Sequence, residues 1–425
     1  MYDRLYNFVE KSNVIFHSQH GFQAGHSPYM NLISMQDKIS SAIENNEYAV
    51  GIFFDLAKAF DTVDHEILLC KLESYGIRGM QLDWFASYFD NRLQCVCCNG
   101  ALSDLKVINF GVPQGSNLGP LLFLIYINDL PNVSSILFFI LFADDTNVFY
   151  SHKSLHSLFE TVNAELTLAA DWFCANKLTL NLEKTNFIIF KSHRKSGPLD
   201  NQMSLNINDV PITQVNSTKF LGVYVDQHMT WKEHIHNIAI KIAKNVGILA
   251  RTSYLLPQPI RMKLYYSLVY PYLTYCNLIW ASTYDTRLNR LVILQKRAIR
   301  IVAGARPREH TAPLFSILKL LNIEQIKTVQ IGEFLYRYEH GLLPLAFRGF
   351  FQHGTEIHSY QTRNAKAFRP VFAHTNTRLF SIKSVGTAIW NNLPKDIRDA
   401  RNLHMFKKML RLHLINDCNS PVPCV

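Results

Sequence analysis

The sequence predicts an α+β protein, with strands in the first half of the chain and helices in the second. Two apolar runs of β type, 49–54 and 136–143, each end at aspartate. The second run has eight apolar residues, too few to cross a bilayer and about right for a buried strand. From Trp231 onward, apolar residues recur at helical spacing instead. These observations set the fold class.

Helices are also expected between the strands of the first half. Residues 1–11 have an amphipathic pattern, and Ser27-Pro28 is a helix start, because serine caps the first turn and proline fits its first position. Asp61 and Asp64 are candidate caps for a third helix. The other elements expected here are helices near 29–45, 64–75, 80–90, 116–130 (capped by Ser116) and 154–174, and strands near 92–98, 105–110 and 186–190.

The second half begins with a strand–glycine–strand element at 219–226. Helices are expected after it, since apolar stripes alternate with basic faces. Their ranges are 232–252, 259–270, 285–303, 323–341 and 403–415, with a loop-rich stretch at 343–380.

Length and composition exclude several classes of protein. A chain of 425 residues predicts two or three domains, and 48% apolar residues exclude a disordered chain. No signal peptide and no apolar run of membrane-spanning length is apparent. The eight cysteines are scattered without metal-binding spacing, which favours reduced, mostly structural thiols. We therefore expect an intracellular protein, in the nucleus or cytoplasm, without a membrane partner.

The charge is divided unevenly along the chain. Residues 1–231 contain 15 Lys and Arg against 23 Asp and Glu, a net charge of −8. Residues 232–425 contain 28 against 10, a net charge of +18. Basic residues can simply solvate a helical surface, but an excess of this size favours contact with a polyanion such as nucleic acid.

The aspartates that end the two apolar runs form a candidate metal site. An isolated Asp144-Asp145 pair is more often a surface turn, and the pattern predicts a tight turn over 144–147. Asp55 changes that balance, because neighbouring strands would bring a third carboxylate to the same edge of a sheet. Oxygen ligands suit magnesium, and two such ions, roughly 3.5–4 Å apart, serve in-line phosphoryl transfer.

Four segments around these aspartates resemble a known family. They are 55–61, 111–120, 126–130 and 142–145, with the sequences DLAKAFD, GVPQGSNLGP, YINDL and FADD. In this order and spacing they resemble the palm of a non-LTR (LINE-type, Jockey-like) retrotransposon reverse transcriptase. The resemblance covers nearly the whole chain. Such proteins commonly carry an N-terminal endonuclease domain as well, which this chain is expected to lack.

The resemblance implies a right-hand polymerase and assigns a range to each part. These are partial fingers at 1–47, the palm with the remaining fingers elements at 48–226, a helical thumb at 227–305 and a basic C-terminal extension at 306–425. The palm would be built on an antiparallel sheet.

The resemblance also implies roles for individual residues. Asp55, Asp144 and Asp145 would bind two Mg²⁺ ions, with Mn²⁺ as the alternative metal and the Leu56 carbonyl as an extra ligand. Lys184 would neutralise departing pyrophosphate; a plain surface lysine is an equal alternative.

The nucleotide pocket and the primer site follow from the same resemblance. Phe60 would be the steric gate against a ribose 2′-hydroxyl, whereas outside this motif it would be a core residue. Gln114 would lie against the incoming nucleotide, whereas alone it would be a solvent-facing amide. The backbone of Phe220, Leu221 and Gly222 would hold the primer's 3′ end.

The expected function is RNA-directed DNA synthesis, with an RNA template, a DNA primer and deoxynucleoside triphosphates as partners and an endonuclease supplied separately as a further one. Family members usually offer an arginine where this chain has Gln23, and often another at His26. The alternative is therefore a decayed or domesticated copy that binds RNA without catalysis. A third, RNA-templated RNA synthesis, is disfavoured because Phe60 should exclude ribonucleotides.

Overall fold

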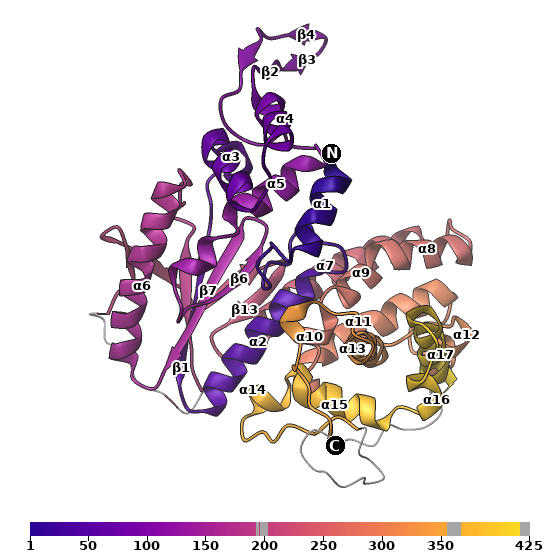
Figure 1. Ribbon diagram of the computed structural model, residues 1–425. Coiled ribbons are helices and arrows are strands. Elements are labelled where there is room, and N and C mark those ends of the chain that lie inside the picture. Colours follow the sequence, from indigo (N-terminus) through magenta and orange to yellow (C-terminus); the bar gives the residue numbers. More distant parts are fainter. Residues whose placement is uncertain (193–194, 196–202, 355–366, 417–425) are drawn as a thin grey trace. The chain divides into compact units, whose positions relative to one another are not determined.

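The computed structural model describes residues 1–192, 195, 203–354 and 367–416 (Figure 1). The chain forms two compact units, each described separately below. The first comprises Met1–Asn31 and Asn46–Asn216, and the second comprises Leu32–Asn45 and Ser217–Val425. The four functional ranges predicted above are finer than this division and stay a prediction. Cys418 and Cys424 lie outside the described residues.

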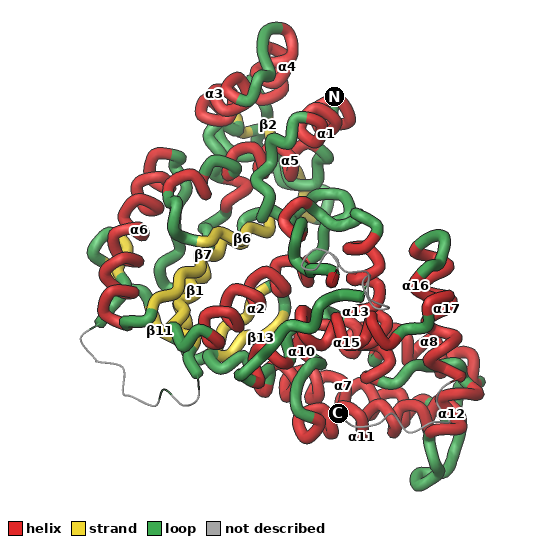
Figure 2. The backbone as a smooth tube through the Cα atoms, turned by 60° about the horizontal axis from the view of Figure 1, so that its bottom comes forward, coloured by secondary structure: helices red, strands yellow, loops and turns green. Residues whose placement is uncertain are grey.

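A five-stranded sheet forms the centre of the first unit. Its order is β11 (Thr213–Gln214), β8 (Asn186–Phe190), β1 (Tyr48–Phe54), β7 (Asp145–His152) and β6 (Phe138–Phe142). β11 pairs with β8 in parallel, and every other pair is antiparallel (yellow in Figure 2). The antiparallel sheet predicted for the first half is therefore confirmed, with one short parallel edge.

β1 is the central strand of the sheet because its residues suit burial on both faces. All residues from Ala49 to Phe54 are buried. Gly51 lies where a Cβ atom would come within 2.7 Å of the Phe149 ring and 3.0 Å of the Phe190 ring. The absence of a side chain at Gly51 thus makes room for aromatic rings from both neighbouring strands.

The predicted turn over 144–147 is wrong in its position. The two-residue turn is Ala143–Asp144, and Phe142 pairs directly with Asp145. Thr146 and Asn147 are buried within β7 and pair with β1. Strand pairing has overridden the turn preference of the Asp-Asp-Thr-Asn sequence.

Two helices of the first unit begin at residues whose side chains cap them. Asp64 accepts a hydrogen bond from the Ile67 amide (3.0 Å), and Ser154 accepts one from Ser157. The helix expected from Ser116 begins instead at Leu118, with Asn117 as an N-cap that makes no side-chain cap bond, and the Ser116 hydroxyl accepts from the Gly119 amide (2.9 Å). Asp61 caps no α-helix but lies in a 3₁₀ turn, η1 (Ala59–Asp61). The helices are α1 (Tyr2–Lys11), the first turn of α2 (Pro28–Glu44), α3 (His65–Ser74), α4 (Met80–Phe89), α5 (Leu118–Ile127) and α6 (Leu155–Ala175), with a second 3₁₀ turn, η2 (Leu130–Val133).

Residues 93–107 form two short ladders rather than the two longer strands predicted there. β2 (Leu93–Gln94) pairs with β5 (Lys106–Val107), and β3 (Cys97–Cys98) pairs with β4 (Ala101–Leu102). All of these residues are exposed, so no apolar face holds a longer strand in place. A third ladder joins β9 (Asn206–Ile207) to β10 (Val210–Pro211).

Five of the six described cysteines are exposed, so the structural role predicted for most of them is wrong for this set.

The second unit is a β-hairpin followed by helices. Ranges predicted at 232–252 and 285–303 match α7 and α11 residue for residue. The elements are β12 (Ser217–Phe220), β13 (Val223–Asp226), α7 (Lys232–Thr252), α8 (Gln258–Leu268), α9 (Tyr270–Thr274), α10 (Asn277–Trp280), α11 (Asp285–Ala303), α12 (Ala312–Ile317), α13 (Ile323–Glu339), η3 (Leu345–Phe347), α14 (Asn376–Leu379), α15 (Ile382–Asn392), α16 (Lys395–Arg398) and α17 (Leu403–Asn416).

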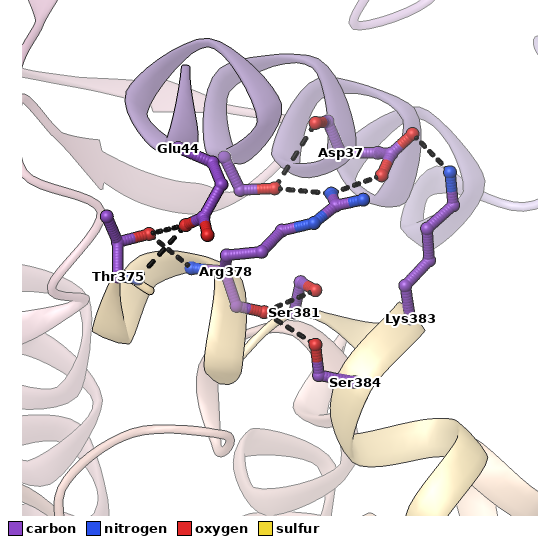
Figure 3. Close-up of polar contacts among 8 residues, drawn as sticks. Asp37, Glu44, Thr375, Arg378, Ser381, Lys383 and Ser384 are labelled. Atoms are coloured by element: carbon purple, nitrogen blue, oxygen red, sulfur yellow. Dashed lines mark hydrogen bonds and ion pairs between the residues drawn. The ribbon is translucent and has the colours of Figure 1, made fainter. Parts of the chain in front are cut away.

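Within the second unit, the last turns of α2 are bonded to the segment that begins at His374. Figure 3 shows Asp37 between two cations, Arg378 (2.7 Å) and Lys383 (2.8 Å). Glu44 accepts hydrogen bonds from the Thr375 amide (3.0 Å) and hydroxyl (2.6 Å). The Asp37, Arg378 and Lys383 side chains are each less than a fifth exposed, so these ion pairs are better shielded than surface pairs.

No helix among the described residues is long and apolar enough to span a membrane.

Candidate active site

Antiparallel pairing of β1 and β7 brings the predicted metal ligands to one end of the sheet. Phe54, the last residue of β1, pairs with Thr146 near the start of β7. Asp55 follows β1, and Asp145 begins β7. The sequence suggested that β1 neighbours the strand before the Ala143–Asp144 turn. The structure instead pairs β1 with β7, the strand after that turn.

Burial and neighbouring charges act on the carboxylates of Asp144 and Asp145. Burial and the Asp55 charge raise the pKa of Asp144. Burial, followed by the charges of Asp144 and Asp55, raises the pKa of Asp145 to about 6. Asp145 is nonetheless an exposed residue by surface area, so solvent screens part of this effect. Like charges held together in this way favour a bound cation, which would lower both pKa values.

The donor set fits a divalent ion in its chemistry. Carboxylate oxygens at an exposed sheet end suit Mg²⁺ or Mn²⁺. In the described part of the chain, however, no three His, Cys, Asp or Glu side chains stand in an arrangement that would already hold a metal ion. The residues therefore supply the ligand types, whereas the coordination geometry is not formed.

Asp55 is held by a segment that the sequence did not connect with it. Its backbone amide donates to the Thr185 hydroxyl (3.3 Å), and its carbonyl accepts from the Asn181 amide (2.8 Å). Leu56 pairs with Leu180 in an isolated β-bridge. Lys184 follows this segment, and its ammonium lies 4.0 Å from the Asp55 carboxylate. Both side chains are largely exposed, so the pair contributes little stability and leaves Lys184 able to move.

Phe60 lies between two aromatic rings. It stacks on the buried Phe123 of α5 at 4.4 Å between ring centroids, and Phe22 approaches it edge-on at 6.1 Å. Phe60 itself is only partly buried. Its position is therefore fixed by packing while part of its surface stays accessible.

Gln114 is adjacent to the Phe60 segment. The Val112 amide donates to the Phe60 carbonyl (2.8 Å), and the Gln114 amide donates to the Asp61 carboxylate (2.8 Å). A Cβ atom on Gly111, whose φ is +90°, would come within 2.8 Å of the Asp61 carbonyl oxygen. Only glycine permits this close approach, so the Gly-Val-Pro-Gln-Gly loop and the Phe60 segment form one structure.

The loop at 20–27 supplies no positive charge where family members have arginine. The Gln23 amide donates to the Gln19 carbonyl. Burial lowers the pKa of His26, and burial with the charges of His26 and His17 lowers the pKa of His20 to about 3. His20 and His26 approach through their Nδ1 atoms (2.9 Å). Both histidines are therefore neutral near pH 7.

The predicted primer-grip residues form the β12–β13 turn of the second unit. Leu221 and Gly222 occupy the turn with φ values of +45° and +81°, and Phe220 is buried. The Tyr275 hydroxyl donates to the Leu221 carbonyl (2.7 Å). The sequence alone does not connect Tyr275 with this turn, because 54 positions separate it from Leu221.

Comparison with known proteins gives consistent matches. The family model for reverse transcriptase (RNA-dependent DNA polymerase) matches residues 1–225, more than half of the chain. The chain is 27% identical over 328 residues to a probable RNA-directed DNA polymerase from transposon X-element of Drosophila melanogaster, covering 75% of this chain and 35% of that protein. It is 29% identical over 314 residues to the RNA-directed DNA polymerase from mobile element jockey of the same species, covering 71% and 34%.

The chain spans about a third of the length of these relatives. Among solved structures, telomerase from Candida albicans aligns over 77% of this chain and 55% of its own, at 11% identity and a TM-score of 0.35. The family match and these relatives place the chain in the reverse transcriptase family, among the reverse transcriptases of non-LTR retrotransposons.

Proposed function

We propose that this chain is an RNA-directed DNA polymerase that extends a DNA primer on an RNA template. The observation that carries the proposal is the placement of Asp55 and Asp145 at one end of two paired strands, with Asp144 in the adjoining turn. Members of this family generally use divalent metal ions. Bound there, such ions would promote ionisation of the primer 3′-hydroxyl and stabilise charge on the α-phosphate.

Asp55, Asp144 and Asp145 would hold the ions, and the carbonyl of Leu56, a residue held in a β-bridge with Leu180, would provide a further oxygen. Lys184 would meet the departing pyrophosphate, since its exposed ammonium lies beside Asp55 without being fixed to it. The protein's contribution is mainly positioning and charge, as expected for phosphoryl transfer.

Phe60 and Gln114 would form the nucleotide pocket. The clamped but partly accessible Phe60 ring would contact the deoxyribose and exclude a 2′-hydroxyl. Gln114 would exchange its bond to Asp61 for one to the nucleotide. Incorporation of deoxynucleotides over ribonucleotides should therefore depend on Phe60, and Phe60→Ala should reduce that preference.

In the second unit, the backbone of Phe220, Leu221 and Gly222 would hold the primer end. The basic helices beyond it would contact the phosphates of the template–primer duplex. Arg290, Lys296 and Arg297 are exposed on α11, opposite its buried apolar stripe. Such contacts read the shape and charge of an A-form hybrid rather than its sequence.

The decisive experiment is primer extension on a generic RNA template with deoxynucleotides and Mg²⁺. Asp144→Asn should abolish incorporation while leaving template–primer binding intact. Asp171→Asn, an exposed aspartate on α6, is the matched control and should behave as wild type. Incorporation by Asp144→Asn at the wild-type rate would overturn the metal-ligand assignment.

One observation favours a second function, RNA binding without polymerisation. Gln23 and the neutral His26 leave the loop without a cation for the triphosphate. Gln23→Arg discriminates between the two, because a limiting loss of charge predicts a lower apparent KM for deoxynucleotide in this variant. Template binding without extension by either protein would favour the binding function.

A further inference from the structure

We propose that Gln19 is a positioning residue that holds the Ala143–Asp144 turn, called the catalytic turn below, and with it Asp144 and Asp145, in its working conformation. The proposal rests on the polymerase function above but concerns a residue outside the metal-binding and nucleotide-binding sets. It follows from four features of the contact between the segment at 18–21 and the β6–β7 hairpin, both in the first unit.

The first feature is a side-chain clamp. Gln19 is 1% exposed. Its Oε1 accepts hydrogen bonds from the Ala143 amide (2.9 Å) and the Gly21 amide (2.8 Å), and its Nε2 lies 3.5 Å from the Ala143 carbonyl oxygen. One buried amide group thus contacts both backbone polar groups of Ala143, the first residue of the turn.

The second feature is backbone pairing along the outer edge of β6. The Leu141 amide donates to the Ser18 carbonyl (3.0 Å), and the His20 amide donates to the Leu141 carbonyl (2.9 Å). Gln19 and Leu141 form a parallel β-bridge. The edge strand that leads to the catalytic turn is therefore covered, and Gln19 is held in register beside it.

The third feature is the close approach of Gly21. A Cβ atom at this position would lie 2.3 Å from the Ala143 amide nitrogen and 3.0 Å from the Ala143 Cα atom. The segment can pass this near to the turn only with glycine there.

The fourth feature is the conformation that the clamp maintains. Ala143 has a φ of +56°, in the left-handed region. Alanine has no side-chain polar group to stabilise this region locally, so the conformation needs support from outside the turn. Because Asp144 and Asp145 follow directly, a change at Ala143 would move both carboxylates.

Gln19→Met tests the proposal, because it preserves the side chain's length and removes all three contacts. Asn128→Leu is the matched control. Asn128 is also buried in the first unit and makes three hydrogen bonds of its own. Two of them, to Val14 and Phe16, anchor the N-terminal region away from the turn, and the third joins Asn128 to Tyr75.

In single-turnover extension, Gln19→Met should lower the incorporation rate about tenfold or more, while template–primer affinity stays unchanged. Asn128→Leu should lose about as much thermal stability as Gln19→Met but keep the wild-type incorporation rate. Adding Ala143→Gly to Gln19→Met should recover at least about threefold of the rate, because glycine adopts positive φ without the clamp. An equal loss of incorporation rate in Gln19→Met and Asn128→Leu would overturn the proposal. So would a double variant that recovers none of the rate.

A measurement independent of activity separates this proposal from the proposed function. Amide hydrogen exchange in a peptide covering 142–145 should become faster in Gln19→Met and stay unchanged in Asn128→Leu. Mn²⁺ binding in the absence of nucleotide, followed by electron paramagnetic resonance, should weaken in Gln19→Met alone. If wild type incorporates nothing, the polymerase proposal fails, and these two results still decide the role of Gln19; unchanged exchange and Mn²⁺ affinity would refute it.

Discussion

Two tight turns, one in each unit, place residues in the left-handed region, but they are stabilised differently. The catalytic turn has Ala143 there and depends on the buried Gln19. The β12–β13 turn has Leu221 and Gly222 there and is bonded by Tyr275, which is 44% exposed. The second turn is therefore partly specified by its own glycine, whereas the first depends on residues more than a hundred positions away.

The comparison teaches where each turn is vulnerable. Local glycine lowers the cost of positive φ within the β12–β13 turn itself. At the catalytic turn, tertiary contacts from Gln19 must offset the unfavourable positive φ of Ala143. The charges of the two adjacent aspartates destabilise this turn further. Substitutions near Ala143 should therefore have larger effects than equivalent ones near Gly222.

Asp145→Asn should have the largest effect on activity, slowing incorporation by about a hundredfold or more because one of the three proposed carboxylate ligands is lost. It should also change the pH dependence of stability. The pKa of Asp145 is raised from 3.8 to about 6 on folding, so its ionisation destabilises the fold as pH rises between those values. Without metal, the stability of Asp145→Asn relative to wild type should rise from pH 4 to pH 6 and then level off.

Urea unfolding with EDTA at pH 4, 5, 6 and 7 measures this difference. Asp171→Asn is again the control. A relative stability of Asp145→Asn that is independent of pH would show that burial and the neighbouring aspartates do not raise the pKa of Asp145 as described.

Gly21→Ala should have the next largest effect, since its new methyl group would overlap the Ala143 backbone. We expect a loss of about 2–3 kcal/mol in the free energy of unfolding and a strong reduction in incorporation. Gly247→Ala on α7 has no atom within 4 Å of the new methyl group and should be neutral or slightly stabilising. Equal stability of the two variants would refute the close approach.

Gly222→Ala should have an intermediate effect. Its φ is +81°, and the Tyr275 ring lies 3.1 Å from the position of a Cβ atom. A loss of about 1–2 kcal/mol is expected, together with a higher apparent KM for primer. Thermal unfolding and primer titration measure the two quantities; an effect larger than that of Gly21→Ala would reverse the comparison.

Tyr275→Phe should have the smallest effect, about 1 kcal/mol, because it removes a single hydrogen bond to the Leu221 carbonyl. Tyr254→Phe, whose side chain is 81% exposed, is the control. If primer affinity falls in Tyr275→Phe but not in the control, the Tyr275 hydroxyl positions the β12–β13 turn for the primer. Unchanged affinity would limit Tyr275 to a structural role.

The fold was predictable where one element carries its own pattern. The apolar run of β1, the Asp64 cap and the stripes of α7 and α11 depend on residues adjacent in sequence, and all four were confirmed. The sequence predicted the catalytic turn at the wrong position, because Thr146 and Asn147, which have turn-forming preferences, pair with β1 instead.

The site was predictable to the level of residue types. The aspartates could be found because Asp55 and the Asp144-Asp145 pair each follow an apolar run, and β1–β7 pairing brings Asp55 to the same sheet end as Asp145. Gln19 and Thr185 could not, because their bonds to Ala143 and Asp55 span 124 and 130 positions and leave no local pattern. A polar residue in a loop gives no sign from sequence that it is buried.

The ion pairs of Asp37 have a consequence for the order in which the nascent chain can fold. Arg378 follows Asp37 by 341 positions. At about 5–20 residues per second, its synthesis comes roughly 20–70 s later. Residues 46–216 are complete well before then, so the first unit can acquire its sheet while Asp37 and Glu44 still lack their partners. The segment from His374 onward thus completes the second unit late in translation, and a ribosome stalled before it would leave the carboxylates of α2 unpaired.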